Sequence, residues 1–311
     1  HRVHVFLAKP AAVLVQDIDA MTEAARKADR MLAVDFQHIY SLAAQDIKER
    51  IHKGDLGKIQ RIVAKLYWPR PKSYYARNDW AGRIKIGDDY VLDGPINNPH
   101  AHYIMNAYYF SSPTRHGFVT PTSVRAELHK ANPIEGEDTA CLSVKTDVGI
   151  PFYMYSTLCS EGQANETKVE IHGSKGMALW GKANYGFNIQ GEAPVEKKSP
   201  RAQSEDPFRY ILKCLDSGER PLVTIEDCRN HVLTTNGAYE SARAIKPIPA
   251  QFLGSSVDKK GEEYVEIKGI NDLIEKSGDA CKMFSEMNVP WAVKTPEFNL
   301  AGYKKFAVDL K

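Results

Sequence analysis

The stretch VHVFLAKPAAVLVQDIDAMTEAARKAD (residues 3–29) decides how the chain begins to fold. VHVFLA (3–8) is mostly apolar and β-branched, which is typical of a buried strand, and Lys9-Pro10 ends it. Residues 17–29 then repeat apolar side chains at helical spacing, with Asp17 as the expected N-cap. A strand, a sharp turn and a helix are the unit of a parallel sheet, so Lys9 is expected at a sheet edge.

The same alternation occurs once more and then stops. MLAVDFQHIY (31–40) predicts a second strand, and SLAAQDIKERIHKG (41–54) predicts a second helix between Ser41 as N-cap and Gly54 as stop. From GKIQRIVAKLYW (57–68) to YGFNIQG (185–191), strand-like segments joined by loops predict a large, mostly antiparallel sheet. HGSKG (172–176) is expected to be a hairpin turn within it, and helices are expected over 208–218 and 226–245.

The composition argues against several classes of function. The 311 residues carry 41 basic and 39 acidic side chains with no long basic run, so nucleic-acid binding has no electrostatic support. Five scattered cysteines without CxxC spacing favour a reduced compartment and argue against a zinc site. No apolar stretch approaches the roughly 18 residues that span a membrane. No two of the 21 glycines are separated by a single residue, so the dinucleotide-binding G-x-G-x-x-G turn is missing.

An ordered series of motifs resembles the glucose–fructose oxidoreductase / inositol dehydrogenase family, called Gfo/Idh/MocA. The motifs are HVFLAKPAA (4–12), VDFQHIYSLAAQDIKERIHKGDLGKI (34–59), YYARNDWAGR (74–83), DGPINNPHAHYI (93–104), IHGSKG (171–176) and RPLVTIEDCRNHVLTTNGAYESA (220–242). The resemblance implies an α/β plus α+β fold. Residues 1–54 are expected to be the last part of a Rossmann dinucleotide-binding domain, without roughly the first hundred residues of the family pattern. Residues 55–311 are expected to form an open-sheet domain for substrate binding and oligomerisation.

The resemblance also implies an activity. Family members are NAD(P)-dependent oxidoreductases that transfer a hydride between a sugar, polyol or related carbohydrate hydroxyl and NAD or NADP. We expect a small-molecule carbohydrate substrate, a homodimer or homotetramer built through the C-terminal sheet, and a cytoplasmic protein, with an exported form as an open alternative. Two other functions stay open: an enzyme that cleaves glycosides through transient oxidation by bound NAD, and a non-catalytic sugar-binding or assembly module.

Two residues are expected to carry the catalysis. Lys9 matches the family lysine that lies near the nicotinamide and the substrate hydroxyl, and Pro10 follows it through a peptide bond that is often cis in the family. Lys9 and Pro10 are therefore the expected cofactor contacts. His102 takes the position of the family histidine and suits a general base. The alternatives are an exposed lysine after a strand and a histidine satisfied within the core.

The chain departs from the family pattern at two positions. Ala8 stands where glutamate is usual, which puts one cofactor contact in doubt. Asn98 stands where aspartate is usual, four residues before His102, so it is expected either to orient the imidazole or to cap a helix that begins at Pro99. Asp93 lies in a D-G-P turn and is expected either to form that turn or to bind a substrate hydroxyl.

The loop YYARNDWAGR (74–83) is the expected substrate loop. Tyr75, Arg77 and Trp80 provide an aromatic plate and multiple hydrogen-bond donors, which is how proteins commonly hold sugars. The alternative is a surface loop whose aromatic residues anchor it to the core. We expect no metal site and no catalytic role for His100, and Glu226-Asp227 are expected only to stabilise a helix N-terminus.

Overall fold

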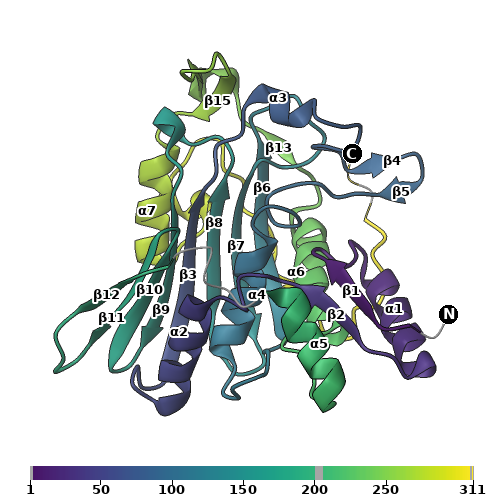
Figure 1. The fold of residues 1–311 in the computed structure, drawn as a ribbon. Coiled ribbons are helices and arrows are strands. Elements are labelled where there is room, and N and C mark those ends of the chain that lie inside the picture. The colour runs from purple at the N-terminus through teal and green to yellow at the C-terminus, as the bar shows by residue number, and fades with distance from the viewer. Residues whose placement is uncertain (1–2, 200–205, 309, 311) are drawn as a thin grey trace.

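The computed structural model describes residues 3–199, 206–308 and 310. Its first strands, β1 (Val5–Ala8) and β2 (Leu32–Asp35), pair in parallel from Val5 opposite Leu32 to Ala8 opposite Asp35. Helices α1 (Val15–Ala28) and α2 (Leu42–Lys53) follow the two strands. The strand–helix–strand–helix prediction is therefore confirmed, and Figure 1 shows this small parallel unit beside the large sheet.

The caps of the two helices differ in how well they were predicted. The Asp17 N-cap is wrong, because α1 begins at Val15 and its Val15 N–H donates to Asn236 Oδ1 on a distant helix at 2.9 Å. In α2 the prediction is confirmed: Ser41 Oγ accepts from the Ala44 N–H at 3.2 Å. Gly54 ends α2 with φ = 80°, a left-handed conformation that favours glycine. The second strand is shorter than expected, since residues 37–40 form a turn.

The large sheet has ten strands and is mostly antiparallel, as predicted. Its order is β12-β11-β10-β9-β3-β8-β7-β6-β13, with β16 also paired to β6. Two neighbouring pairs are parallel, β3 with β8 and β13 with β6. The strands are β3 (Ile59–Tyr67), β6 (Pro121–Lys130), β7 (Thr139–Thr146), β8 (Phe152–Thr157), β9 (Thr167–Gly173), β10 (Gly176–Gly181), β11 (Asn184–Ile189), β12 (Val195–Lys198), β13 (Lys246–Pro247) and β16 (Phe298–Asn299). The predicted hairpin at 172–176 joins β9 to β10.

The remaining elements surround this sheet. They are α3 (Lys72–Tyr75), β4 (Lys85–Ile86), β5 (Asp89–Tyr90), α4 (Ala101–Ser111), η1 (Glu161–Gln163), α5 (Pro207–Ser217), α6 (Ile225–Ala242), η3 (Ala250–Phe252), β14 (Leu253–Val257), β15 (Glu263–Ile267), α7 (Ile270–Ala280) and η4 (Phe284–Met287). Helices α5 and α6 match the two predicted late helices. Asp227 accepts from the Thr224 N–H at 2.8 Å, which confirms its predicted place at a helix N-terminus. No helix among the described residues is both long and apolar enough to cross a bilayer.

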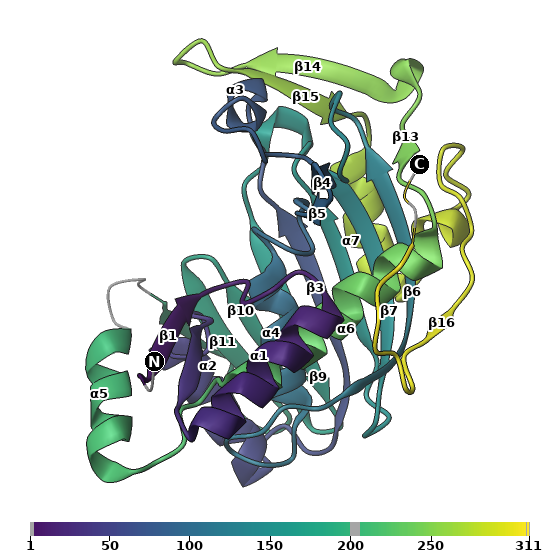
Figure 2. The ribbon, with the colours of Figure 1, turned by 90° about the vertical axis from the view of Figure 1, so that its right-hand side faces the viewer.

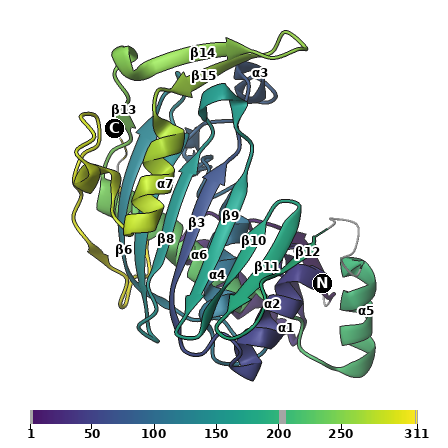
Figure 3. The ribbon, with the colours of Figure 1, turned by 90° about the vertical axis from the view of Figure 1, so that its left-hand side faces the viewer.

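Helices cover both faces of the sheet. α4 and α6 pack on one face, with α1 against α6, and Figure 2 shows α1 and α6 in front of the strands. α7 lies across the other face over β3 and β8 (Figure 3). The buried apolar residues of α1, β2 and α2 belong to the same core as those of the large sheet. The boundary near residue 54 therefore separates two patterns of structure within one continuous core, and the domain division itself stays a prediction.

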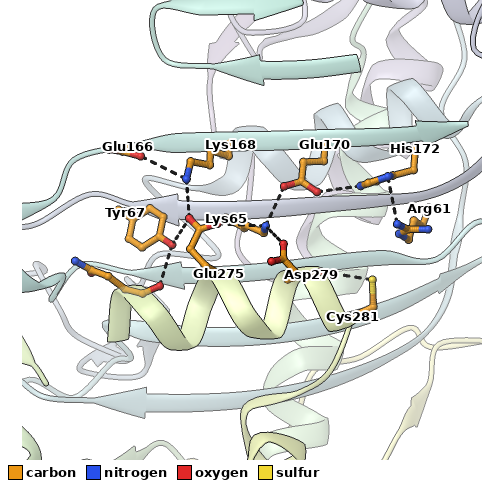
Figure 4. A network of polar contacts seen from close by, with 12 residues as sticks. Arg61, Lys65, Tyr67, Glu166, Lys168, Glu170, His172, Glu275, Asp279 and Cys281 are labelled. Carbon is orange, nitrogen blue, oxygen red and sulfur yellow. Dashed lines mark hydrogen bonds and ion pairs between the residues drawn. The ribbon is translucent and has the colours of Figure 1, made fainter. Parts of the chain in front are cut away.

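A polar network joins α7 to the sheet. The Lys65 ammonium, 2% exposed, contacts Asp279 at 2.6 Å, Glu170 at 2.9 Å and Glu275 at 3.3 Å (Figure 4). Burial alone would raise the pKa of Glu170, but hydrogen bonds from His172 and Lys65 outweigh burial and hold that pKa at about 2. A buried cation among three carboxylates thus fixes the position of α7.

Lys65→Met should destabilise the protein, because it leaves Glu170 without its ammonium partner. We expect a loss of about 2–3 kcal/mol in the free energy of unfolding at neutral pH, less than the roughly 3–5 kcal/mol of a fully buried pair because Glu275 and Asp279 are partly exposed. Denaturant titration of the native protein and of Lys65→Met measures this difference in the free energy of unfolding. Lys168→Met is the control, since Lys168 binds the same Glu275 near the surface and should cost about 0–1 kcal/mol. Equal losses would contradict this role for Lys65.

The same variant changes the dependence of stability on pH. The pKa of Glu170 is lower in the folded state than in the unfolded state, so its contribution is present above about pH 4.5 and is lost as the pH falls toward 2. Unfolding free energies of the native protein should therefore decline over this range, and those of Lys65→Met should decline less steeply. Parallel pH profiles for the two proteins would count against the assignment.

Candidate active site

Residues that follow three different strands contact the loop before α4 or the first turn of α4. Lys9 follows β1 and hydrogen-bonds Asn98 in that loop. His38 follows β2 and stacks on His102 of α4 with ring centroids 4.1 Å apart. Trp68 follows β3, and its ring lies edge-on to the His100 ring at 5.1 Å. The candidate site therefore forms where the carboxyl ends of these strands meet the start of α4, the usual place for a site in an α/β sheet.

Lys9, Asn98 and Asp93 form a continuous hydrogen-bonded chain. The Lys9 ammonium donates to the backbone oxygen of Asn98 and, at 3.1 Å, to its side-chain Oδ1. Asn98 Nδ2 in turn donates to Asp93 Oδ1 at 2.8 Å. An amide meets both needs because it presents an acceptor to the ammonium and a donor to the carboxylate. This is a contact that an aspartate at position 98 would not make in the same way.

Asn98 therefore does not cap the helix. α4 begins at Ala101 with His100 in the capping position, so the predicted N-cap at Asn98 followed by Pro99 is wrong. The expected pairing of Asn98 and His102 on one helical face is also absent, because Asn98 lies in the turn before α4. The Asn98 side chain bonds Asp93, five residues earlier, and Lys9, which is distant in sequence, and no helix pattern reveals either contact.

Asp93 ties the loop 74–83 to this chain. Its Oδ2 accepts the Gly82 N–H at 2.7 Å and lies 3.9 Å from Arg77 Nη2. The Arg77 guanidinium lies over the Tyr74 ring at 3.6 Å and over the Trp80 ring at 4.8 Å. The expected substrate loop is thus held against the site through one buried carboxylate.

The predicted members of this loop face different surroundings. Trp80 is 36% exposed, whereas the Tyr75 hydroxyl is buried without a hydrogen-bond partner, and burial raises the pKa of Tyr75 well above its ordinary value. Tyr75 packs under the loop beside Gly82. Trp80 is therefore partly open to solvent, whereas Tyr75 anchors the loop, and a ligand contact at Arg77 or Trp80 stays a prediction.

The Lys9 ammonium has a perturbed acidity. Burial, the largest effect, lowers the pKa of Lys9; the Asp93 carboxylate raises it, and the Arg70 guanidinium lowers it further, with the result at about 8. A lysine with such a pKa is cationic in most molecules at neutral pH but releases its proton readily. It can therefore stabilise an anion or take part in proton transfer. The Lys9-Pro10 peptide bond is cis, as the family pattern implied.

His102 is buried rather than open to solvent. It is 4% exposed and packs between His38 and the edge of Phe36, and its Nδ1 has no hydrogen-bond partner. Burial lowers the pKa of His102 well below its ordinary value, and the nearby His38 and Lys9 add to this. The imidazole is therefore neutral near pH 7, and its burial disfavours the protonated form. His100, also buried, bonds Ser156 Oγ through Nδ1 at 2.5 Å.

An aromatic cavity of about 290 Å³ opens beside this cluster. Its lining residues come from six segments: Gln37, His38, Ser41, Trp68, Tyr103, Thr167, Trp180, Gly181, Lys182 and Ser199. None of the predicted substrate residues lines it. His38, Trp68, Arg70 and Tyr103 were not singled out from the sequence, yet the rule that ligands bind at carboxyl ends of strands points to the first three.

Lys9 should titrate far below an ordinary lysine. We expect acetylation by acetic anhydride, followed by peptide mass spectrometry, to give Lys9 a midpoint near pH 8, against about 10.4 for exposed lysines. In Asp93→Asn the midpoint should fall further, because the charge that raises the pKa is gone. Lys27, 71% exposed, provides the internal reference. A Lys9 midpoint of about 10 would show that the ammonium is not desolvated.

Comparison with known proteins places the chain among dehydrogenases. Residues 44–179 match the family model of the GFO/IDH/MocA C-terminal domain. The myo-inositol 2-dehydrogenase of Thermotoga maritima is 30% identical over 250 residues, which cover 76% of this chain and 70% of that protein.

Solved structures share the fold. A WlbA dehydrogenase from Bordetella pertussis, in complex with NADH and UDP-GlcNAcA, aligns with a TM-score of 0.62 at 24% identity over 77% of this chain and 69% of that one. A levoglucosan dehydrogenase in complex with NADH and L-sorbose aligns with a TM-score of 0.64 at 16% identity over 77% and 71% of the two chains. Both carry NADH, in agreement with the expected nicotinamide cofactor.

Proposed function

Because the chain belongs to the GFO/IDH/MocA family of oxidoreductases, we propose that it transfers a hydride between a carbohydrate hydroxyl carbon and NAD or NADP. The observation that carries this proposal is Lys9: a partly buried ammonium at the end of a parallel strand, with a pKa of about 8 and two hydrogen bonds to Asn98. The aromatic cavity that His38 and Trp68 line suits a sugar ring, because aromatic faces bind the apolar face of a pyranose or polyol.

Different residues of the site have different proposed roles in alcohol oxidation. Loss of a hydride from a CH–OH carbon requires that the hydroxyl proton leave and that the developing alkoxide be stabilised. The Lys9 ammonium supplies the positive charge, and Asn98 with Asp93 fixes its position. His102 or the stacked His38 is the proposed proton acceptor, since the two imidazoles stack with centroids 4.1 Å apart and lie close enough to Lys9 for its charge to act on His102.

The proposed nicotinamide site lies at the end of β1. A nicotinamide, when bound, accepts or supplies the hydride. Lys9 and Pro10 are the proposed residues beside it, because the lowered pKa of Lys9 is the kind of perturbation expected next to a reacting group. In the described residues the small parallel sheet consists of β1 and β2, and there is no glycine-rich phosphate turn.

Lys9→Met tests the proposal directly. With a panel of sugars and polyols and with NAD or NADP, we expect kcat/KM to fall by about 10²- to 10⁴-fold, the range for removing a positioned proton-transfer or charge-stabilising group. Formation of the reduced nicotinamide is the readout. Lys27→Met, on the exposed face of α1, should leave the rate unchanged.

The outcome also separates the alternatives. Accumulation of reduced cofactor supports the dehydrogenase. Glycoside cleavage without net reduction of the cofactor identifies the glycoside-cleaving alternative, because such an enzyme returns the hydride in each cycle. Sugar binding with neither reaction identifies the non-catalytic module.

We also propose self-association through the large sheet. α7 covers β3 and β8, so the part of that face left for a second copy lies over β9–β12. Leu179 on β10 is 41% exposed there, and Met177 is its neighbour along a hollow of about 820 Å³. Exposed apolar surface of this kind marks an interaction site.

Leu179→Lys should weaken the oligomer by placing a charge in its interface. Size-exclusion chromatography with light scattering is expected to show a dimer or tetramer for the native chain and a lower mass for the variant. Val257→Lys, on the exposed β14, is the matched control and should keep the native mass. A native chain that is monomeric at all concentrations contradicts this part of the proposal.

A further inference from the structure

Arg70 lies at the site without a carboxylate partner. It follows Trp68 and Pro69 after β3, and its guanidinium lies 5.5 Å from the Trp68 ring centroid and 4.6 Å from that of Tyr74. In the described part of the chain, no carboxylate pairs with Arg70, and its Nε is buried without a hydrogen-bond partner. Buried donors are nearly always satisfied, so an orphaned guanidinium nitrogen needs an explanation.

The charge of Arg70 acts on the candidate catalytic residues. It lowers the pKa of Lys9 and that of His100, in each case after the larger effect of burial. The Lys9 ammonium and the Arg70 guanidinium are thus close enough to repel each other. The nearby carboxylate, Asp93, already accepts from Gly82 and Asn98 and lies near Arg77. The site therefore holds a positive charge that its own residues do not neutralise.

The cavity that shares Trp68 with Arg70 also has a positively charged lining among the described residues. Trp68 supplies both a cavity wall and a ring below the Arg70 guanidinium. In the part of the chain that the structure describes, the cavity lining contains Lys182 and no aspartate or glutamate. A neutral sugar is normally held by carboxylates that accept its hydroxyl protons, and this lining offers none of them.

We propose that Arg70 binds a carboxylate group of the substrate, so that the substrate is an acidic carbohydrate of the uronic or aldonic acid class. The planar guanidinium presents two parallel N–H donors that match the two oxygens of a carboxylate. The Trp68 and Tyr74 rings hold the guanidinium in place before the ligand arrives, which reduces the entropy lost on binding. This assignment of substrate class rests on the proposed function for the reaction itself, but the binding step stands without it.

Direct binding tests the assignment. Isothermal titration of the protein with an aldonate, a uronate and the corresponding neutral aldose should give measurable binding of an acid and much weaker binding of the aldose. In Arg70→Gln, binding of the acid should weaken by about 10- to 100-fold, as expected when a charge-assisted hydrogen-bonded pair is lost. Binding of the acid by the native protein should also weaken as salt is added.

Two further variants separate the effect of charge at position 70 from the effect of hydrogen-bond geometry and from general effects of removing an arginine. Arg70→Lys keeps the charge but not the bidentate geometry, so it should bind the acid with an affinity between those of the native protein and Arg70→Gln. Arg125→Gln is the matched control, because Arg125 on β6 lies outside the candidate site and is already paired with Glu286 at 2.6 Å. It should bind the acid as the native protein does.

The possible results separate this inference from the proposed function. Arg70-dependent binding of an acid without any hydride transfer supports the inference and overturns the proposed function. Hydride transfer from neutral sugars at rates unaffected by Arg70→Gln supports the proposed function and overturns the inference. Tighter Arg70-dependent binding of a sugar phosphate than of any carboxylate overturns the assignment to acidic carbohydrates.

Discussion

The hydrogen bonds between Lys9 and Asn98 join the two kinds of structure in this protein. Lys9 belongs to the small parallel sheet and Asn98 to the loop before α4, 89 residues later. Asn98 positions Lys9 through both its backbone and its side-chain oxygen, and Asp93 orients the Asn98 side chain by accepting from its amide. Since Asp93 also accepts a hydrogen bond from the Gly82 N–H, the same chain of contacts positions the loop that carries Arg77 and Trp80. The chemistry of the site depends on these buried polar contacts, each of which would be costly to leave unpaired.

Much of the fold follows from local sequence. Apolar runs and helix caps such as Ser41 and Gly54 predict the alternation of β1, α1, β2 and α2, and the change to a β-rich pattern after residue 57 predicts the large sheet. These signals are local, so the sequence carries them directly. The N-terminus of α1 could not be predicted in this way, because its hydrogen bond comes from Asn236, more than two hundred residues away.

The candidate site was predictable in part, for the same reason. Lys9, Asp93 and Asn98 could be singled out from motifs, but their hydrogen-bonded order could not, because Asn98 reads equally well as a helix cap. His38 and Arg70 escaped notice because nothing near them in the sequence marks them; only the meeting of strand ends does. His102 was expected to be either a general base or a histidine satisfied within the core, and its ring lies behind His38 in the core.

The links between β2, α1 and α6 have a consequence for how the chain acquires its structure. The Val34 N–H bonds the Val223 oxygen at 3.2 Å, and Asn236 completes the start of α1. The small parallel sheet thus receives part of its hydrogen bonding from residues that a ribosome adds much later. Contacts of such long sequence separation slow folding, since the loop must close before it gains any interaction. During synthesis the first strands must wait for α6, and we expect a chaperone that shields apolar strands to act in this interval.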